Sequence, residues 1–249
     1  MSDPRTAVVV GASSGIGRAL AHELARAGHD LVLGARDLDE LRAIATDLEL
    51  RHGIAAIPLA VDLCGPDDEL ERFADACLER FPTLDAVLVP AGGAIDDDDG
   101  RASWEAVTAL VTTNFLAIAK LATRFLDRFD DQDRGTLVLF SSIATAAPRG
   151  DNIVYGASKA ALTYFGEAQQ HRFAGRPVHV QVCVLGYVDT AQTSGMDLKL
   201  PVADPHAIAA TVVAGLGRPR RTRHLPRFWR AVTAALRALP WPVYRRLKF

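Results

Sequence analysis

Tyr155 and Lys159 lie four residues apart in a segment, Tyr155 to Phe173, whose pattern predicts a helix. This spacing puts both side chains on one face of the helix, close enough to interact. An ammonium beside a phenol favours the phenolate and lowers the tyrosine pKa from its usual value of about 10. Such a tyrosine can donate and accept a proton while an alcohol and a ketone interconvert. Alone, Tyr-x-x-x-Lys also describes an ordinary solvated helix face.

Ser142 follows an apolar run and precedes Tyr155 by thirteen residues. Its hydroxyl could hold the oxygen of a carbonyl substrate. The neighbouring Ser141 offers the same chemistry, but side chains alternate along a strand, so we expect Ser141 to point to the opposite side. The sequence therefore predicts Ser142, Tyr155 and Lys159 as catalytic residues.

A glycine-rich loop connects the first apolar run to a helical segment that ends at Ala27: Gly11-Ala12-Ser13-Ser14-Gly15-Ile16-Gly17. Glycines let a backbone turn sharply and approach a pyrophosphate, which the free N–H groups at a helix N-terminus attract. The strand before the loop and the helix after it are the context that a dinucleotide site requires. Without that role, the loop would be only a tight turn. We expect a dinucleotide to be bound by Gly11, Ser13, Ser14, Gly15, Ile16 and Gly17.

The second apolar run ends in Leu33-Gly34-Ala35-Arg36, without a carboxylate. An acidic residue at this place would accept hydrogen bonds from the ribose 2′-hydroxyl of NAD. A guanidinium can instead pair with the 2′-phosphate of NADP. Arg36 thus favours NADP(H) over NAD(H), unless it only begins a solvated helix.

These residues must be positioned by alternating short apolar runs and amphipathic helices. The expected strands are Ala7–Val10, Leu31–Ala35, Ala55–Val61, Ala86–Val89, Thr136–Phe140 and Val178–Leu185, and the helices between them include Gly17–Ala27, Leu38–Arg51 and Asp67–Phe81. Nearly continuous apolar strands are typical of a sheet buried on both faces. The alternation predicts an α/β fold with a doubly wound parallel sheet of the Rossmann type and helices on both faces. We expect one NADP-binding and catalytic domain, 1–225, followed by a C-terminal amphipathic extension, 226–249.

The composition is that of a globular protein, since 49% of the 249 residues are hydrophobic and 23% are charged. Three scattered cysteines, Cys64, Cys77 and Cys183, lack metal-ligand spacing, so we expect packed, reduced thiols and no metal site. The acidic run Asp96–Asp99 predicts a solvated loop. We find neither a signal-peptide core nor a stretch approaching the length of a membrane span, which indicates a cytoplasmic body.

Residues 10–17, Val-Gly-Ala-Ser-Ser-Gly-Ile-Gly, resemble the dinucleotide loop of the short-chain dehydrogenase/reductase family. The resemblance covers residues 5 to about 215, and it adds Asn114 to a tetrad with Ser142, Tyr155 and Lys159, in which the asparagine completes a proton relay through a water. It further implies that the cofactor is contacted by Asp62 and Leu63 at the adenine, by Ala91 and Gly92 beneath it, and by Val188 and Thr190 near the nicotinamide.

Two segments depart from the family's pattern. The usual Asn-Asn-Ala-Gly after the fourth strand is Val89-Pro90-Ala91-Gly92 here, so the two asparagines that would contact the cofactor are absent. The usual Pro-Gly after the sixth strand is Leu185-Gly186, so that loop lacks the proline that would restrict its backbone.

The C-terminal segment carries only positive charge after Asp204. Between Pro226 and Leu239, the residues Phe228, Trp229, Val232, Leu236 and Leu239 recur at helical spacing. A basic amphipathic helix with aromatic residues is typical of a segment at a membrane surface, but its apolar face could equally dock on the protein body or on a second subunit. No nucleic-acid module is present, so we expect no nucleic-acid partner.

The tail, from Pro226-Arg227-Phe228-Trp229 to Arg245-Arg246-Leu247-Lys248-Phe249, also resembles that of reductases acting on polyprenyl-phosphoryl 2-keto-pentoses. This resemblance implies a lipid-linked carbonyl substrate and an enzyme held at the inner membrane face. The main prediction is an NADP(H)-dependent ketone reductase or alcohol dehydrogenase that forms a homo-oligomer. The alternatives are a regulatory or scaffold protein that binds NADP without turnover, and a sugar epimerase, which shares Tyr-x-x-x-Lys.

Overall fold

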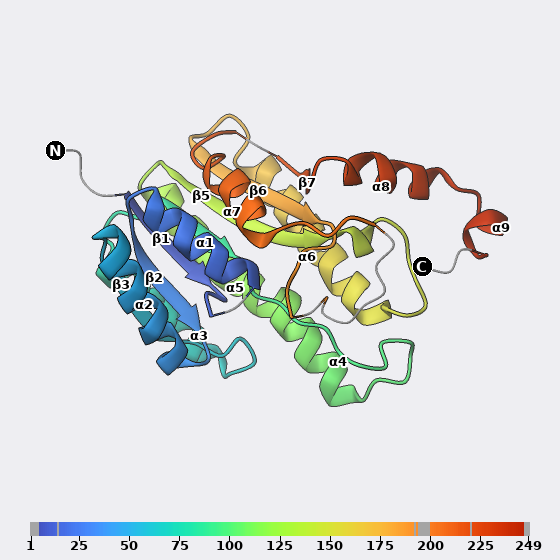
Figure 1. The fold of residues 1–249 in the computed structure, drawn as a ribbon, viewed down its shortest axis with the longest axis horizontal. Helices are drawn as coiled ribbons and strands as arrows, with labels where there is room; N and C mark the ends of the chain where they lie inside the picture. Colours follow the sequence, from blue (N-terminus) through green and yellow to red (C-terminus); the bar gives the residue numbers. More distant parts are fainter. Residues whose placement is uncertain (1–4, 14, 192, 194–199, 220, 247–249) are drawn as a thin grey trace.

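The computed structural model describes residues 5–13, 15–191, 193, 200–219 and 221–246. Over these residues the chain forms one parallel sheet of seven strands in the order β3-β2-β1-β4-β5-β6-β7 (Figure 1). The strands are β1 (Arg5–Val10), β2 (His29–Ala35), β3 (Ala56–Ala60), β4 (Ala86–Val89), β5 (Gly135–Ser142), β6 (Val178–Leu185) and β7 (Arg223–Leu225). The six apolar runs are therefore confirmed as strands. The short, polar β7 lacked such a run and was not predicted.

Side chains of the sheet alternate between two hydrophobic cores. Val8 and Val10 of β1 face the core that holds the buried side chains of α3 (Asp67–Arg80) and α5 (Ala117–Asp131). Ala7 and Val9 face the core that contains α1 (Gly15–Arg26), α2 (Leu38–His52) and α7 (Pro205–Val213). Burial on both faces explains the continuous apolar runs and confirms the doubly wound fold. The strand order reverses between β1 and β4, and such switch points in open sheets hold ligands at the carboxyl ends of the strands.

A continuous helical stretch, Trp104–Asp131, comprises α4 (Trp104–Val111), a π-helical turn η1 (Thr112–Leu116) and α5. An 18-residue window within it has a mean hydropathy of 1.4, and by length and composition this stretch could cross a membrane, contrary to our expectation that no segment would. Its buried side chains, among them Ile118, Leu121 and Phe125, fill the core beside α3. One third of the 18-residue window is buried inside the structure.

The helix α6 (Ile153–Arg172) begins two residues before the predicted start at Tyr155. A short 3₁₀ turn, η2 (Ile143–Thr145), follows β5. Cys77 and Cys183 are buried, as expected, but Cys64 is exposed rather than packed because it lies in the turn between β3 and α3. No cluster of metal-ligating side chains occurs among the residues that the structure covers.

The C-terminal segment forms α8 (Trp229–Ala238) and α9 (Trp241–Tyr244), which extend beyond the end of the sheet (Figure 1). Trp229 is only 2% exposed, and its indole lies so close to Gly186 that an added Cβ there would be 1.8 Å from Trp229 Nε1. Tyr187 packs edge-on against the same indole. The first turn of the predicted amphipathic helix is therefore docked on the protein body.

Candidate active site

Lys159, the cation of the predicted tetrad, is buried on α6 at 6% exposure. Its Nζ donates a hydrogen bond of 3.2 Å to the carbonyl oxygen of Phe140 at the carboxyl end of β5. A Cβ added to Gly92 would lie 2.9 Å from this ammonium nitrogen, so a side chain at position 92 would displace it. Burial lowers the pKa of Lys159 to about 8, because a low-dielectric surrounding disfavours the charged form. The ammonium still predominates at neutral pH.

Asn114 is fully buried in the π-helical turn η1. Its Oδ1 accepts a hydrogen bond of 2.8 Å from the Gly93 N–H, and its Nδ2 donates to the Gly93 carbonyl oxygen at 3.0 Å and to Ser158 Oγ at 3.2 Å. The amide thus fixes the loop after β4 and joins it to α6. π-helical turns often occur at functional sites because they redirect one side chain.

The two serines at the end of β5 face different surroundings, as the alternation predicts. Ser141 is buried, and its Oγ donates to the Lys159 carbonyl oxygen at 3.2 Å and lies 2.6 Å from Thr163 Oγ1. Ser142 is half-buried, and its Oγ accepts a hydrogen bond of 3.1 Å from the Ala144 N–H. A hydroxyl that accepts from the backbone keeps its own proton for another acceptor. Ser142 can therefore donate to a carbonyl oxygen.

Tyr155 lies one helical turn before Lys159 and is half-buried. Its backbone N–H donates to Asp98 Oδ2 at 2.9 Å. Our expectation of a solvated loop over Asp96–Asp99 is wrong for Asp98, which is 6% exposed because its carboxylate caps α6. Four identical acids in a row carry no signal that distinguishes the one that folds inward.

The glycine loop has the close backbone approach that a dinucleotide site needs. Gly11 has a φ of +93°, and an added Cβ would lie 2.8 Å from Ala91 Cα. A Cβ on Gly17 would lie 1.8 Å from the Gly11 carbonyl oxygen. Gly15, at φ +54°, is at the start of α1, where a Cβ would lie 3.3 Å from Thr190 Cγ2. The loop therefore meets the segments after β4 and β6, as the predicted cofactor site requires.

Two of the remaining residues of the glycine loop make contacts within the protein. Ser13 accepts a hydrogen bond from the Arg18 guanidinium through its carbonyl oxygen, at 2.6 Å. Ile16 packs against the core on the α1 side of the sheet. Ser14 lies outside the described residues.

Arg36 is exposed at the end of β2, and it forms no ion pair with any residue in the described ranges. Arg18, by contrast, is paired with Glu40. An unpaired guanidinium beside the glycine loop fits an anionic group such as a phosphate.

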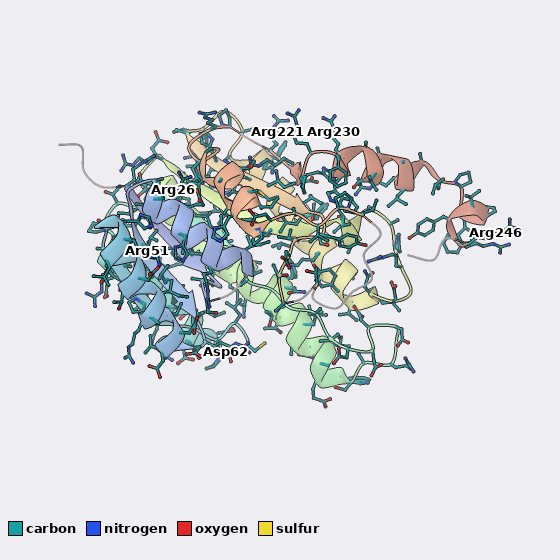
Figure 2. All side chains as sticks on the ribbon, viewed as in Figure 1. Arg26, Arg51, Asp62, Arg221, Arg230 and Arg246 are labelled. Carbon is teal, nitrogen blue, oxygen red and sulfur yellow. The ribbon has the colours of Figure 1, made fainter. Side chains whose placement is uncertain are left out.

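At the end of β3, Asp62 Oδ1 accepts a hydrogen bond of 2.9 Å from the Cys64 N–H, and Leu63 is buried. Asp62 appears in Figure 2 at the edge of the sheet where β2 and β3 end. Val188 is buried after β6, and its carbonyl oxygen accepts from Thr193 Oγ1 at 2.6 Å, while the Thr190 N–H donates to the same Oγ1 at 3.2 Å. These contacts close the loop that faces Gly15.

The fold and these neighbouring loops are those of a dinucleotide-binding protein of the Rossmann type. The family model described as short chain dehydrogenase matches residues 5–199. The chain therefore belongs to the short-chain dehydrogenase family, as its sequence motifs predicted, and it is an NAD(P)-dependent oxidoreductase.

Similar proteins cover nearly the whole chain. An uncharacterized oxidoreductase of Myxococcus xanthus is 30% identical over 98% of this chain and 98% of its own. One from Mycobacterium tuberculosis is 33% identical over 96% of each. Among solved structures, a short-chain dehydrogenase from Sphingobium yanoikuyae in complex with NADPH has a TM-score of 0.82 and 27% identity, and it covers 98% of this chain and 96% of its own.

Proposed function

We propose that this protein interconverts a ketone and a secondary alcohol with NADP(H). The observation that carries the proposal is the buried Lys159 ammonium beside Gly92, one helical turn after Tyr155. Burying a cation is unfavourable, and a group with a shifted pKa in such a place is typical of a catalytic site. The nicotinamide, when bound, supplies or accepts the hydride.

The side chains of the tetrad would handle the proton. Ser142 donates a hydrogen bond to the substrate oxygen, and Tyr155 gives its phenolic proton to that oxygen during reduction and recovers it during oxidation. Lys159 stabilises the phenolate between these events. Asn114 holds Gly93 and Ser158 in place and thereby shapes the polar end of the site.

We infer that NADP(H) is preferred over NAD(H), because Arg36 is exposed and unpaired within the described part of the chain. The glycine loop would hold the pyrophosphate, and Asp62 and Leu63 would border the adenine. The Sphingobium yanoikuyae neighbour is described with NADPH, which supports this choice.

The test is Tyr155→Phe, which keeps the ring and removes only the hydroxyl. We expect NADPH oxidation with a panel of ketones to fall by about 10²–10⁴-fold while NADPH affinity is retained. Tyr164→Phe is the matched control, since Tyr164 is on the same helix and 79% exposed. Near-wild-type rates for Tyr155→Phe would contradict the mechanism. An NADPH-binding wild-type protein that reduces no ketone would instead indicate a binding role without turnover.

We further propose that the tail meets the inner face of an anionic membrane, where a lipid-linked substrate would be found, while the body lies in the cytoplasm. Phe228, Trp241 and Val243 are exposed on the tail. Arg230 and Arg246 lie at its outer edge (Figure 2). Each basic residue near an anionic surface contributes about 1 kcal/mol to binding.

We also propose that the protein forms a homo-oligomer in which a second copy covers exposed aromatic and apolar side chains of α4 and α6. Trp104 of α4 is 88% exposed, and Ile153 and Tyr164 of α6 are exposed as well. α4 and α6 are in contact, so these side chains belong to neighbouring helices. Sedimentation of wild-type protein and Trp104→Ala tests whether a second copy covers them.

A further inference from the structure

Asp98 occupies the N-terminus of α6 although it belongs to the loop that precedes α4. Its backbone carbonyl oxygen accepts a hydrogen bond of 3.0 Å from the Ile153 N–H. Its Oδ1 accepts from the Val154 N–H at 2.7 Å, and its Oδ2 accepts from the Tyr155 N–H at 2.9 Å. One residue therefore satisfies the first three N–H groups of the helix.

These N–H groups have no partner within the helix, and a local cap normally takes them. The residue at the N-cap position, Asn152, makes no side-chain capping bond here. The contact thus joins residues that are more than fifty positions apart, and it uses both oxygens of a carboxylate.

The charge of Asp98 is compensated by the helix itself. Arg101 pairs with Asp97 and Asp99, and no ion pair to Asp98 occurs among the residues described. The partial positive charge at a helix N-terminus stabilises a buried carboxylate. Asp98 therefore has a defined position, whereas Asp96, Asp97 and Asp99 are exposed.

The loop that contains Asp98 is also held at Gly93, by a residue of the predicted tetrad. Asn114 holds Gly93 through two hydrogen bonds, five residues before Asp98. The segment from Gly93 to Asp98 therefore connects the backbone that follows Gly92 to the first turn of α6, which carries Tyr155.

We propose that Asp98 is a positioning residue, which sets the first turn of α6 so that the Tyr155 phenol is held at the substrate oxygen. This proposal rests on the proposed function. Without the carboxylate, the first turn frays, and the proton donor is displaced from the place where the reaction needs it. A displacement of about 1 Å can lower a rate by about 10²-fold.

The decisive variant is Asp98→Asn, which keeps the size of the side chain but turns an amide N–H₂ toward one of the two backbone N–H donors. Asp96→Asn is the control, because it removes the same charge from an exposed position of the same run. The measurements are kcat and KM for a ketone substrate, NADPH affinity by fluorescence, and hydrogen–deuterium exchange of the peptide that contains residues 153–155.

We expect Asp98→Asn to lower kcat by about 10–100-fold with NADPH affinity unchanged and with faster exchange confined to the start of α6. Asp96→Asn should behave as wild type. An unchanged kcat in Asp98→Asn, or a loss of NADPH affinity with faster exchange throughout the protein, would overturn the proposal. If wild-type protein reduces no ketone, the proposed function fails. The exchange measurement still decides whether Asp98 holds this helix end: unchanged exchange refutes the contact, and faster exchange supports it.

Discussion

Replacing Lys159 by methionine should stabilise the protein without its cofactor while it abolishes activity. Methionine has nearly the length of lysine but needs no solvation, and Lys159 is almost completely buried. Burial lowers the pKa of Lys159 from 10.5 to about 8. That difference corresponds to about 3 kcal/mol of unfavourable free energy for holding the charge in the folded state below pH 8.

Part of this gain is lost with the side chain. The variant forfeits the hydrogen bond from Nζ to the Phe140 carbonyl oxygen, which is worth about 1 kcal/mol. We therefore expect a net stabilisation of about 1–3 kcal/mol at pH 7, or a rise in Tm of about 2–12 °C for a chain of this size. Turnover should be lost, since the phenolate of Tyr155 is no longer stabilised.

The pH dependence of stability tests whether the buried charge of Lys159 causes this difference. Between pH 8 and about 10.5, the unfolded wild-type chain binds the Lys159 proton that the folded protein has released, so wild-type stability should rise with pH relative to the variant. Calorimetry from pH 7 to 10 should show the gap in Tm narrowing. Lys120→Met is the control, because Lys120 is half-exposed and should respond little. A Tm of Lys159→Met at or below the wild-type value at pH 7, or a gap independent of pH, would refute the reasoning.

Three further changes test other parts of the structure. Ala35→Asp combined with Arg36→Leu should shift preference from NADP toward NAD, and an unchanged ratio of the two kcat/KM values would refute the role of Arg36. Gly186→Ala should destabilise the protein by about 1–3 kcal/mol and red-shift Trp229 fluorescence, because the added Cβ overlaps the indole. Deleting residues 240–249, which leaves the docked Trp229 in place, should weaken binding to anionic liposomes at low salt, whereas unchanged co-sedimentation would contradict the membrane proposal.

Sequence alone determined the features that depend on local spacing. The alternation of side chains distinguished Ser142 from Ser141, and the glycine spacing located the turn between β1 and α1. The four-residue spacing put Tyr155 and Lys159 on one helix. Continuous apolar runs marked six strands because burial on both faces of a sheet needs apolar side chains at every position.

The tertiary structure decided which distant segments meet. Burial of Lys159, the inward turn of Asp98 and the docking of Trp229 on Gly186 each join residues far apart in the chain. β7 is an edge strand of three residues, held by pairing with β6 rather than by its own composition. Such contacts leave no period in the sequence, because their free energy comes from the partner segment, and only the closure of the chain brings that partner into place.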